Sequence, residues 1–236
     1  FLKPSYVRNV FPGEPPQTYG DAVAELIRRE EIDYRGRRNV LVSHQFYTGN
    51  ELPETCDSET FSVGGIDNVD IGAVKDFDYV ALGHLHGVQS VGMPHIRYCG
   101  TLLKYSVSES GQEKALTLVT LSQKGSPPKV ERLALHPLRD VKKKRGNLAE
   151  ILEAANEEER DDYVSITLTD EVDPYKPKEQ LEEVFDRILE VKADNARTRN
   201  KLREMDEELV LKDPLETLIF IRRCRADSLR RKNWRL

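Results

Sequence analysis

Short apolar runs separated by polar, glycine-containing segments cover the first half of the chain. Two of these runs, 39–43 and 77–82, are rich in β-branched and aromatic residues, which favour buried strands. Between residues 19 and 31 the apolar positions instead recur at helical spacing and form a stripe against charged positions. A helix that leads into a strand in this way predicts a layered α/β fold.

The next part of the chain shows strand-like runs with no helix between them, and this pattern predicts a β-meander. The runs are 88–92, 95–99, 115–121 and 129–135. Near residue 138 the composition changes, and a basic run from 139 to 145 begins. A helix predicted at 147–156 and a strand at 163–168 then favour a small α+β domain. Two further predicted helices, 195–208 and 214–231, follow, and the second has an apolar face that could dock on a partner.

Composition and charge narrow the class of protein. The 236 residues are 33% charged and 38% hydrophobic, with a net charge of −5, so the whole chain is not a basic nucleic-acid-binding surface. No apolar run approaches the roughly 20 residues of a membrane span, and no signal-peptide pattern opens the sequence. The three cysteines have no CxxC spacing, which argues against a disulfide framework or a zinc knuckle. We therefore expect a cytoplasmic protein with no membrane partner.

Histidines follow both core strands. The first strand ends at His44, and the second leads through Gly83 to His84 and His86. Residues i and i+2 of an extended chain point to the same side, so His84 and His86 can face one site. Gly83 has no Cβ and leaves room for an ion or for closely packed backbone. Three of the chain's five histidines at strand ends predict a metal site; the alternative is imidazoles hydrogen-bonded in turns.

The chain resembles the SbcD family of bacterial nuclease subunits, which are calcineurin-like metallophosphoesterases, in four segments that occur in the family's order. They are VSHQF at 42–46, VGGID at 63–67, FDYVALGHLH at 77–86 and RYCGTLLKYSVSE at 97–109. The resemblance runs from Phe1 to about Asn200. It implies that 1–137 is the C-terminal part of a metallophosphoesterase β-sandwich with flanking helices. It further implies a DNA-positioning capping domain at 138–205 and a helical tail at 206–236 that binds the ATPase SbcC.

The resemblance also implies an activity. The protein would be a subunit of a metal-dependent DNA exonuclease and endonuclease that acts with SbcC on double-stranded DNA ends and hairpins, in repair, recombination and replication. The complex would be dimeric and use two divalent metal ions, manganese by ligand chemistry, with His44 and His84 on one ion and His86 on the other. Two alternatives stay open: a calcineurin-like phosphoesterase that acts on small phosphoesters, and a non-catalytic partner-binding or DNA-binding fragment.

Three metal-binding motifs of the family are absent from the chain: Asp-x-His, Gly-Asp-x-x-x-x-Asp and Gly-Asn-His-Asp. The opening segment, Phe1 to Pro4, reads as the end of a strand. We therefore expect the remaining ligands and the general-acid histidine to lie in a preceding part of a longer protein. On this interpretation the chain holds no catalytic residue of its own and is inactive alone.

Other residues are candidates for supporting roles. Gln45 and Gly83 adjoin the predicted ligands and are candidates to hold them in place. Lys104 and Tyr105 follow the histidine motif and are candidates to contact the DNA backbone.

The segment 178–192 allows two interpretations. Its apolar periodicity predicts one continuous helix, whereas the family resemblance predicts a strand at Ile188–Ala193 after several missing residues near Arg187. We favour the strand.

Overall fold

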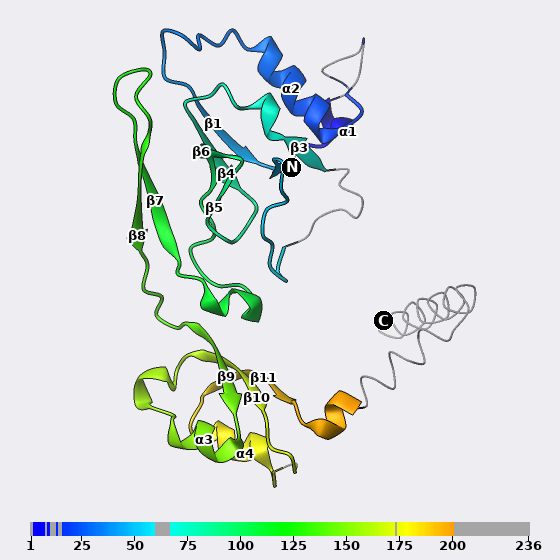
Figure 1. Ribbon diagram of the computed structural model, residues 1–236, viewed down its shortest axis with the longest axis vertical. Coiled ribbons are helices and arrows are strands. Elements are labelled where there is room, and N and C mark those ends of the chain that lie inside the picture. The colour runs from blue at the N-terminus through cyan, green and yellow to red at the C-terminus, as the bar shows by residue number, and fades with distance from the viewer. Residues whose placement is uncertain are drawn as a thin grey trace, which may run out of the picture. The chain divides into compact units, whose positions relative to one another are not determined.

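The computed structural model describes residues 2–7, 9, 13, 16–59, 67–172 and 174–200. The described chain is a mixed α/β protein with several separate sheets, in agreement with the predicted α/β class (Figure 1). It divides into two compact units, Phe1–Lys143 and Lys144–Leu236. This division falls a few residues after the predicted start of a second domain at 138, and the predicted tail at 206–236 lies outside the described residues. No helix in the described ranges is both long enough and apolar enough to span a bilayer.

A four-stranded sheet with the order β1-β4-β6-β5 forms the centre of the first unit (Figure 1). Its strands are β1 (Val40–His44), β4 (Tyr79–Gly83), β5 (Gln89–Val91) and β6 (Met93–Tyr98). The pairs β1–β4 and β4–β6 are parallel, while β5 runs antiparallel to β6. The carboxyl ends of β1 and β4 therefore meet, and the register pairs His44 with Gly83.

The helix α2 (Tyr19–Arg29) begins at a reciprocal cap. Thr18 accepts a hydrogen bond from the N–H of Asp21, and the Asp21 carboxylate accepts one from the N–H of Thr18, each at 3.0 Å. Before this helix lies α1 (Pro4–Val7), so the prediction of a strand ending at residue 4 was wrong. Proline suits the first turn of a helix, where no N–H partner is needed, and this explains the difference.

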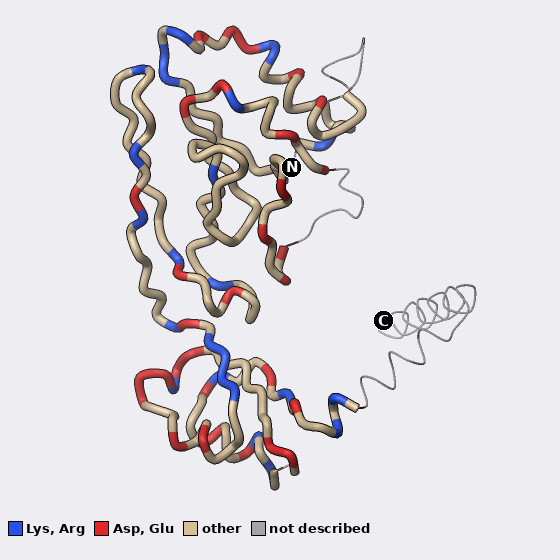
Figure 2. The backbone as a smooth tube through the Cα atoms, in the orientation of Figure 1, with Lys and Arg blue, Asp and Glu red and all other residues tan. Residues whose placement is uncertain are grey.

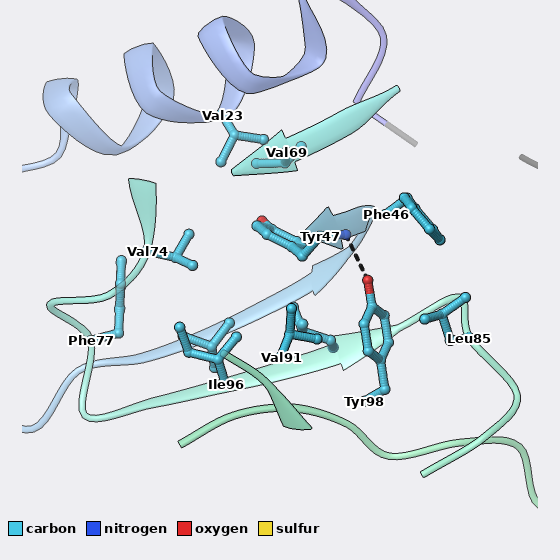
Figure 3. Close-up of a cluster of buried hydrophobic side chains, with 12 residues drawn as sticks. Val23, Phe46, Tyr47, Val69, Val74, Phe77, Leu85, Val91, Ile96 and Tyr98 are labelled. Atoms are coloured by element: carbon cyan, nitrogen blue, oxygen red, sulfur yellow. Dashed lines mark hydrogen bonds between the residues drawn. The ribbon is translucent and has the colours of Figure 1, made fainter. Parts of the chain in front are cut away.

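The core of the first unit lies between α2, the central sheet and a short parallel pair, β2 (Phe46–Thr48) and β3 (Asn68–Asp70). Figure 3 shows these side chains, with Val23 of α2 near Val69 of β3. Each large apolar side chain buried in this way contributes roughly 1.5–3 kcal/mol. The buried cluster is Val23, Phe46, Tyr47, Val69, Val74, Phe77, Val80, Leu82, Leu85, Val91, Ile96 and Tyr98.

A separate antiparallel hairpin, β7 (Ala115–Thr120) and β8 (Lys129–Ala134), follows the short 3-10 helix η2 (Val107–Gly111). Another 3-10 turn, η1 (Ile71–Ala73), follows β3. The predicted β-meander is confirmed in the antiparallel pairs β5–β6 and β7–β8 but was wrong between them, because β6 lies next to β4 in parallel and the hairpin forms its own sheet. Sequence periodicity identifies strands but carries no information on which strand pairs with which.

A partly buried ionic cluster anchors the hairpin turn to the central sheet. Asp78, just before β4, pairs with Arg38 at 2.9 Å and with Lys124 of the turn at 2.6 Å. Arg38 also donates to the carbonyls of three turn residues, Ser122, Gln123 and Ser126. The Asp78 carboxylate accepts a further bond from the N–H of Asn39, so a single side chain fixes the starts of β1 and β4.

At one edge of the sheet lies β1, which has the lowest burial of the parallel strands. Val40 is 46% exposed and Val42 is 80% exposed. Parallel strands rich in valine and leucine are usually covered on both faces. This edge is therefore an exposed apolar strand.

The second unit is built on a three-stranded sheet with the order β11-β10-β9, of which β9 begins just before the boundary at Lys144. Its elements are β9 (Val141–Gly146), α3 (Leu148–Glu153), the 3-10 turn η3 (Glu157–Glu159), β10 (Tyr163–Leu168), α4 (Pro177–Glu182) and β11 (Arg187–Ala193). The basic run of the sequence forms β9, which is blue along its length in Figure 2. The buried core is Leu148, Ile151, Val164, Ile166, Leu168, Leu181 and Phe185.

The strand interpretation of the 178–192 segment is confirmed, and the continuous helix was wrong. The helix α4 ends at Glu182, and β11 pairs in parallel with β10. Leu181 and Phe185 are buried, and Ile188 and Val191 of β11 pack on the same core. The helical periodicity arose because two different elements place apolar residues against one core.

Candidate metal centre

His44 and His84 lie together at the carboxyl ends of β1 and β4. Their ring centroids are 5.5 Å apart, with the rings at 68° to one another. Phe46, at the start of β2, lies on another side of His84 with a centroid distance of 6.1 Å. The parallel register produces this pair, because His44 stands opposite Gly83 and His84 is the next residue. Two of the three predicted ligands are thus brought together.

The backbone at Gly83 and His84 is specialised. A Cβ on Gly83 would lie 2.8 Å from Nδ1 of His44, closer than any normal contact, so the position requires glycine while His44 keeps this rotamer. His84 has φ of 106°, a conformation that non-glycine residues rarely adopt. Such strain persists only where the surrounding structure imposes it, and it is frequent at functional sites.

The electrostatic environment favours a neutral His84. Burial lowers the pKa of its imidazole, the positive charge that His44 can carry lowers it further, and the carboxylates of Glu59 and Asp67 act in the opposite direction. A neutral imidazole keeps a lone pair for a metal ion. The two rings are close, Gly83 leaves room beside His44, and the environment keeps His84 neutral. These features fit a pair of metal ligands.

His86 has a different set of neighbours in the described chain. Its Nδ1 lies 2.9 Å from Oγ of Ser58 and 3.2 Å from Oε1 of Glu109. Its ring centroid is 5.5 Å from that of Tyr105. A positive charge on His86 would lower the pKa of His84, which lies two residues earlier in the chain.

Glu109 is the most buried charged group near these histidines, with 0% exposure. Its carboxylate accepts hydrogen bonds from Lys114 at 2.7 Å and from Ser58 at 2.8 Å. Burial by itself would raise its pKa, but the bonds from Lys114, Ser58 and His86 lower it to about 2. Glu109 is therefore a permanent anion at neutral pH.

Cys56, His86 and Glu109 together offer three metal-ligand atoms within 4.8 Å of one another. Hydrogen bonds already account for this proximity. The thiol of Cys56 lies 3.2 Å from Oγ of Ser58, which also bonds His86 and Glu109. The ammonium of Lys114 on the same carboxylate repels a second cation there. This group fits a hydrogen-bonded cluster better than an ion site.

The remaining predicted site residues have distinct environments. Lys104 points into the fold: its ammonium pairs with Asp140 at 2.9 Å and donates to the carbonyl of Ser110 at 2.8 Å. Tyr105 is 65% exposed beside His86, so its side chain can meet a ligand. The ammonium of Lys104 is instead held within the fold. Gln45 is buried and donates to the carbonyl of Leu2 at 3.3 Å. The predicted roles of these residues stay predictions.

The network around His86 was not predicted from the sequence. Ser58, Glu59 and Lys114 lie outside any recognised motif, and their contacts span 27 or 28 positions along the chain. Glu109 closes the RYCGTLLKYSVSE segment, so its place in that segment is the signal that could have identified it.

Comparisons with known proteins bear on this site. The family model SbcD_C, described as the Type 5 capsule protein repressor C-terminal domain, matches residues 134–227. The chain is also 29% identical over 193 residues to SbcD, a component of the nuclease SbcCD, of Staphylococcus epidermidis (strain ATCC 12228 / FDA PCI 1200). That alignment covers 80% of this chain and 50% of the relative. The chain is SbcD-like.

The resemblance to SbcD that the four segments predicted is thereby confirmed. The SbcD-like chain spans about half the length of the curated relative that it matches. The similarity to a nuclease subunit suggests divalent metal ions, and the assignment of His44 and His84 as metal ligands stays a prediction.

Proposed function

We propose that this SbcD-like chain is part of the nuclease subunit of an SbcCD-type complex and contributes three imidazoles to a two-metal phosphodiesterase centre. The observation that carries the proposal is the pairing of His44 and His84 at adjacent strand ends, 5.5 Å apart, in a chain similar to a nuclease subunit. The substrate would be DNA, cleaved exonucleolytically and endonucleolytically at double-stranded ends and hairpins together with the ATPase SbcC.

The ligand roles are those that the resemblance to the SbcD family implies. His44 and His84 would hold one divalent ion and His86 the other, with manganese favoured by mixed nitrogen and oxygen ligands. When bound, such ions neutralise phosphate charge and make water a better nucleophile at neutral pH. Three neutral imidazoles cannot balance two divalent cations. The carboxylates that complete the centre, and the general-acid histidine, would therefore lie in a part of the protein beyond this chain.

Within this chain, the protein supplies position and polarity. The β1–β4 register fixes the His44–His84 pair, and the apolar ring of Phe46 packs edge-on to His84. Tyr105, exposed beside His86, would stack on or hydrogen-bond to a nucleotide near the site. Lys104 is held by Asp140 and would support this loop rather than neutralise a phosphate.

The larger architecture is part of the same proposal. The first unit would be the C-terminal part of a metallophosphoesterase sandwich, and the second unit would be a capping domain that positions DNA. The segment 206–236 would bind SbcC. The complex would be dimeric, cytoplasmic and active in DNA repair, recombination and replication.

Nuclease assays on two proteins test the activity. Purified 1–236 should bind at most one manganese ion weakly, by calorimetry, and should cleave no DNA. A longer protein that includes the preceding segment should cleave linear duplex DNA only with manganese, and His84→Ala should abolish cleavage. Robust manganese-dependent cleavage by 1–236 would contradict the ligand count, and full activity of the His84→Ala protein would remove the site assignment.

Co-purification tests the proposed partner. Deletion of 210–236 should abolish co-purification with SbcC, while a protein with the exposed substitution Leu138→Ala should bind SbcC like the original chain. Unchanged binding after the deletion would exclude the tail as the docking segment.

A further inference from the structure

Every polar group of His86 except Nε2 has a hydrogen-bond partner in the described chain. Its backbone N–H donates to the carboxylate of Glu59. Its carbonyl accepts from the ammonium of Lys114 at 3.0 Å and from the N–H of Thr101 at 3.2 Å. Its Nδ1 contacts Ser58 and Glu109 at the distances given for the metal centre. The residue is therefore fixed at its backbone and at one ring nitrogen, and a single ring nitrogen is left for a ligand.

The position of the proton on the His86 ring follows from counting hydrogens. Ser58 has one hydroxyl hydrogen, and the Glu109 carboxylate, which is paired with the Lys114 ammonium at 2.7 Å, accepts it at 2.8 Å. The oxygen of Ser58 must then be the acceptor in its contact with Nδ1 of His86. Glu109 can likewise only accept from Nδ1. Both contacts require a hydrogen on Nδ1, so the neutral ring carries its lone pair on Nε2.

We propose that Glu109 is a positioning residue for His86: with Ser58 it holds the ring proton on Nδ1 and so presents Nε2 as the metal-binding atom. The metal ion in this inference rests on the proposed function, whereas the tautomer of His86 does not depend on it. A carboxylate that orients a ligating imidazole raises its basicity and fixes its direction.

Lys114 keeps Glu109 in this role. Its ammonium lies 2.7 Å from Oε2, while the other oxygen, Oε1, faces His86. The same ammonium bonds the carbonyl of His86 and the hydroxyl of Thr101 at 2.9 Å. One buried cation thus connects the carboxylate, the histidine backbone and the following loop. Two more donors, the Ser106 hydroxyl at 3.0 Å and the Tyr105 N–H at 3.1 Å, complete the shell of Oε1.

The tautomer can be measured directly in metal-free 1–236. Long-range nitrogen–proton correlation spectra of a ¹⁵N-histidine sample distinguish a protonated Nδ1 from a protonated Nε2, and a His86→Gln sample assigns the signals. We expect His86 to be mainly the Nδ1–H tautomer. A ring that is mainly Nε2–H would overturn the proposal.

Two variants and one control test the assignment to Glu109. Glu109→Gln can turn either its oxygen or its NH₂ group to the ring, so it should give a mixture of the two tautomers. If that variant fails to fold, Ser58→Ala leaves the Glu109–Lys114 pair and its contact with Nδ1 intact, so the ring should stay mainly Nδ1–H. Ser106→Ala removes a bond to the same carboxylate oxygen without touching His86, and its tautomer should be unchanged. A pure Nδ1–H ring in Glu109→Gln, or a mainly Nε2–H ring in Ser58→Ala, would refute the role.

Metal binding by the longer protein gives the second measurement. Glu109→Gln should weaken manganese binding about 10–100-fold, whereas Ser106→Ala should change it by less than about twofold. With cobalt in place of manganese, the absorption spectrum should show no thiolate-to-metal charge-transfer band. Such a band would identify Cys56 as a ligand and overturn the hydrogen-bonded interpretation of the cluster. An Nδ1–H ring in a longer protein without nuclease activity would leave the tautomer assignment standing and reject the proposed function. An Nε2–H ring in a longer protein that has nuclease activity would reject the role of Glu109 and leave the proposed function standing.

Discussion

The hydroxyl of Tyr98 accepts a hydrogen bond from the backbone N–H of Tyr47 at 2.7 Å, and both groups are buried (Figure 3). The same hydroxyl donates to the carbonyl of Gln45 at 3.0 Å. It therefore satisfies two main-chain groups where the chain passes from β1 to β2. That connection directly follows His44, so a side chain of β6 sets the path of the backbone beyond a predicted metal ligand.

Tyr98→Phe should destabilise the protein, because it leaves a buried N–H and a buried carbonyl without partners. The expected loss in the free energy of unfolding is about 2 kcal/mol, measured by urea denaturation. Tyr79→Phe is the matched control, since its hydroxyl makes no hydrogen bond within the described ranges; it should cost much less. Equal losses in the two variants would show that the Tyr98 hydroxyl has no special role.

Gly83→Ala should displace the imidazole of His44, because the new methyl group would lie 2.8 Å from its Nδ1. We expect manganese affinity of the longer protein to fall at least about tenfold, with a stability cost of about 1–3 kcal/mol from overpacking. Gly111→Ala, where an added Cβ meets nothing within 4 Å, should leave manganese binding unchanged. Normal affinity in Gly83→Ala would mean that His44 can bind in another rotamer.

His84→Gly should be more stable than His84→Ala, the reverse of the usual order. Both variants lose the imidazole, but only glycine adopts φ of 106° without strain, which is worth about 1–2 kcal/mol. At Val42, an ordinary exposed strand position, the usual order should hold, and Val42→Ala should be more stable than Val42→Gly. Thermal unfolding of all four proteins decides the matter, and greater stability of His84→Ala would show that the backbone relaxes when the ring is removed.

Asp78 should make stability depend on pH in the acid range. Burial raises the pKa of its carboxyl group, but bonds from Lys124, the Asn39 N–H and Arg38 together lower it below the ordinary 3.8. A lowered folded-state pKa means that the stabilisation is complete above pH 3.8 and is lost as pH falls through the lower folded value. Asp78→Asn should therefore cost about 1–3 kcal/mol at neutral pH and progressively less in acid.

Urea denaturation across this pH range checks the expectation for Asp78. The exposed Asp76→Asn variant serves as the control, because it lies in the same turn but outside the ionic cluster. A stability difference between Asp78→Asn and the original chain that stays constant from neutral pH to well below 3.8 would contradict the linkage.

The sequence predicted strands and their ends better than it predicted strand pairing. The strand at 163–168 and the histidines after β1 and β4 were located from local patterns, because burial alternates or persists along a strand. The antiparallel meander was right for β5–β6 and β7–β8 but wrong for β6–β7, since the parallel β4–β6 pair depends on a chain crossover that periodicity does not encode. β9 was overlooked because its four consecutive basic residues carry no apolar pattern.

The candidate site was predicted only in part for a related reason. His44 and His84 could be placed together because parallel strands share one edge. The partners of His86 come from segments near residues 58 and 109, and loops bring them together through side-chain bonds. No spacing rule anticipates such contacts. Lys104 shows the opposite difficulty: a lysine that the resemblance suggested for DNA is engaged by Asp140.

The exposed edge strand β1 has a consequence for how the isolated chain behaves in solution. Its outward backbone groups and the exposed Val40 and Val42 form a template on which another strand can add. At high concentration, copies of this chain should therefore self-associate edge to edge, as a rise in light scattering would reveal. Val42→Lys should reduce this self-association without disturbing the core, because the side chain at position 42 is 80% exposed.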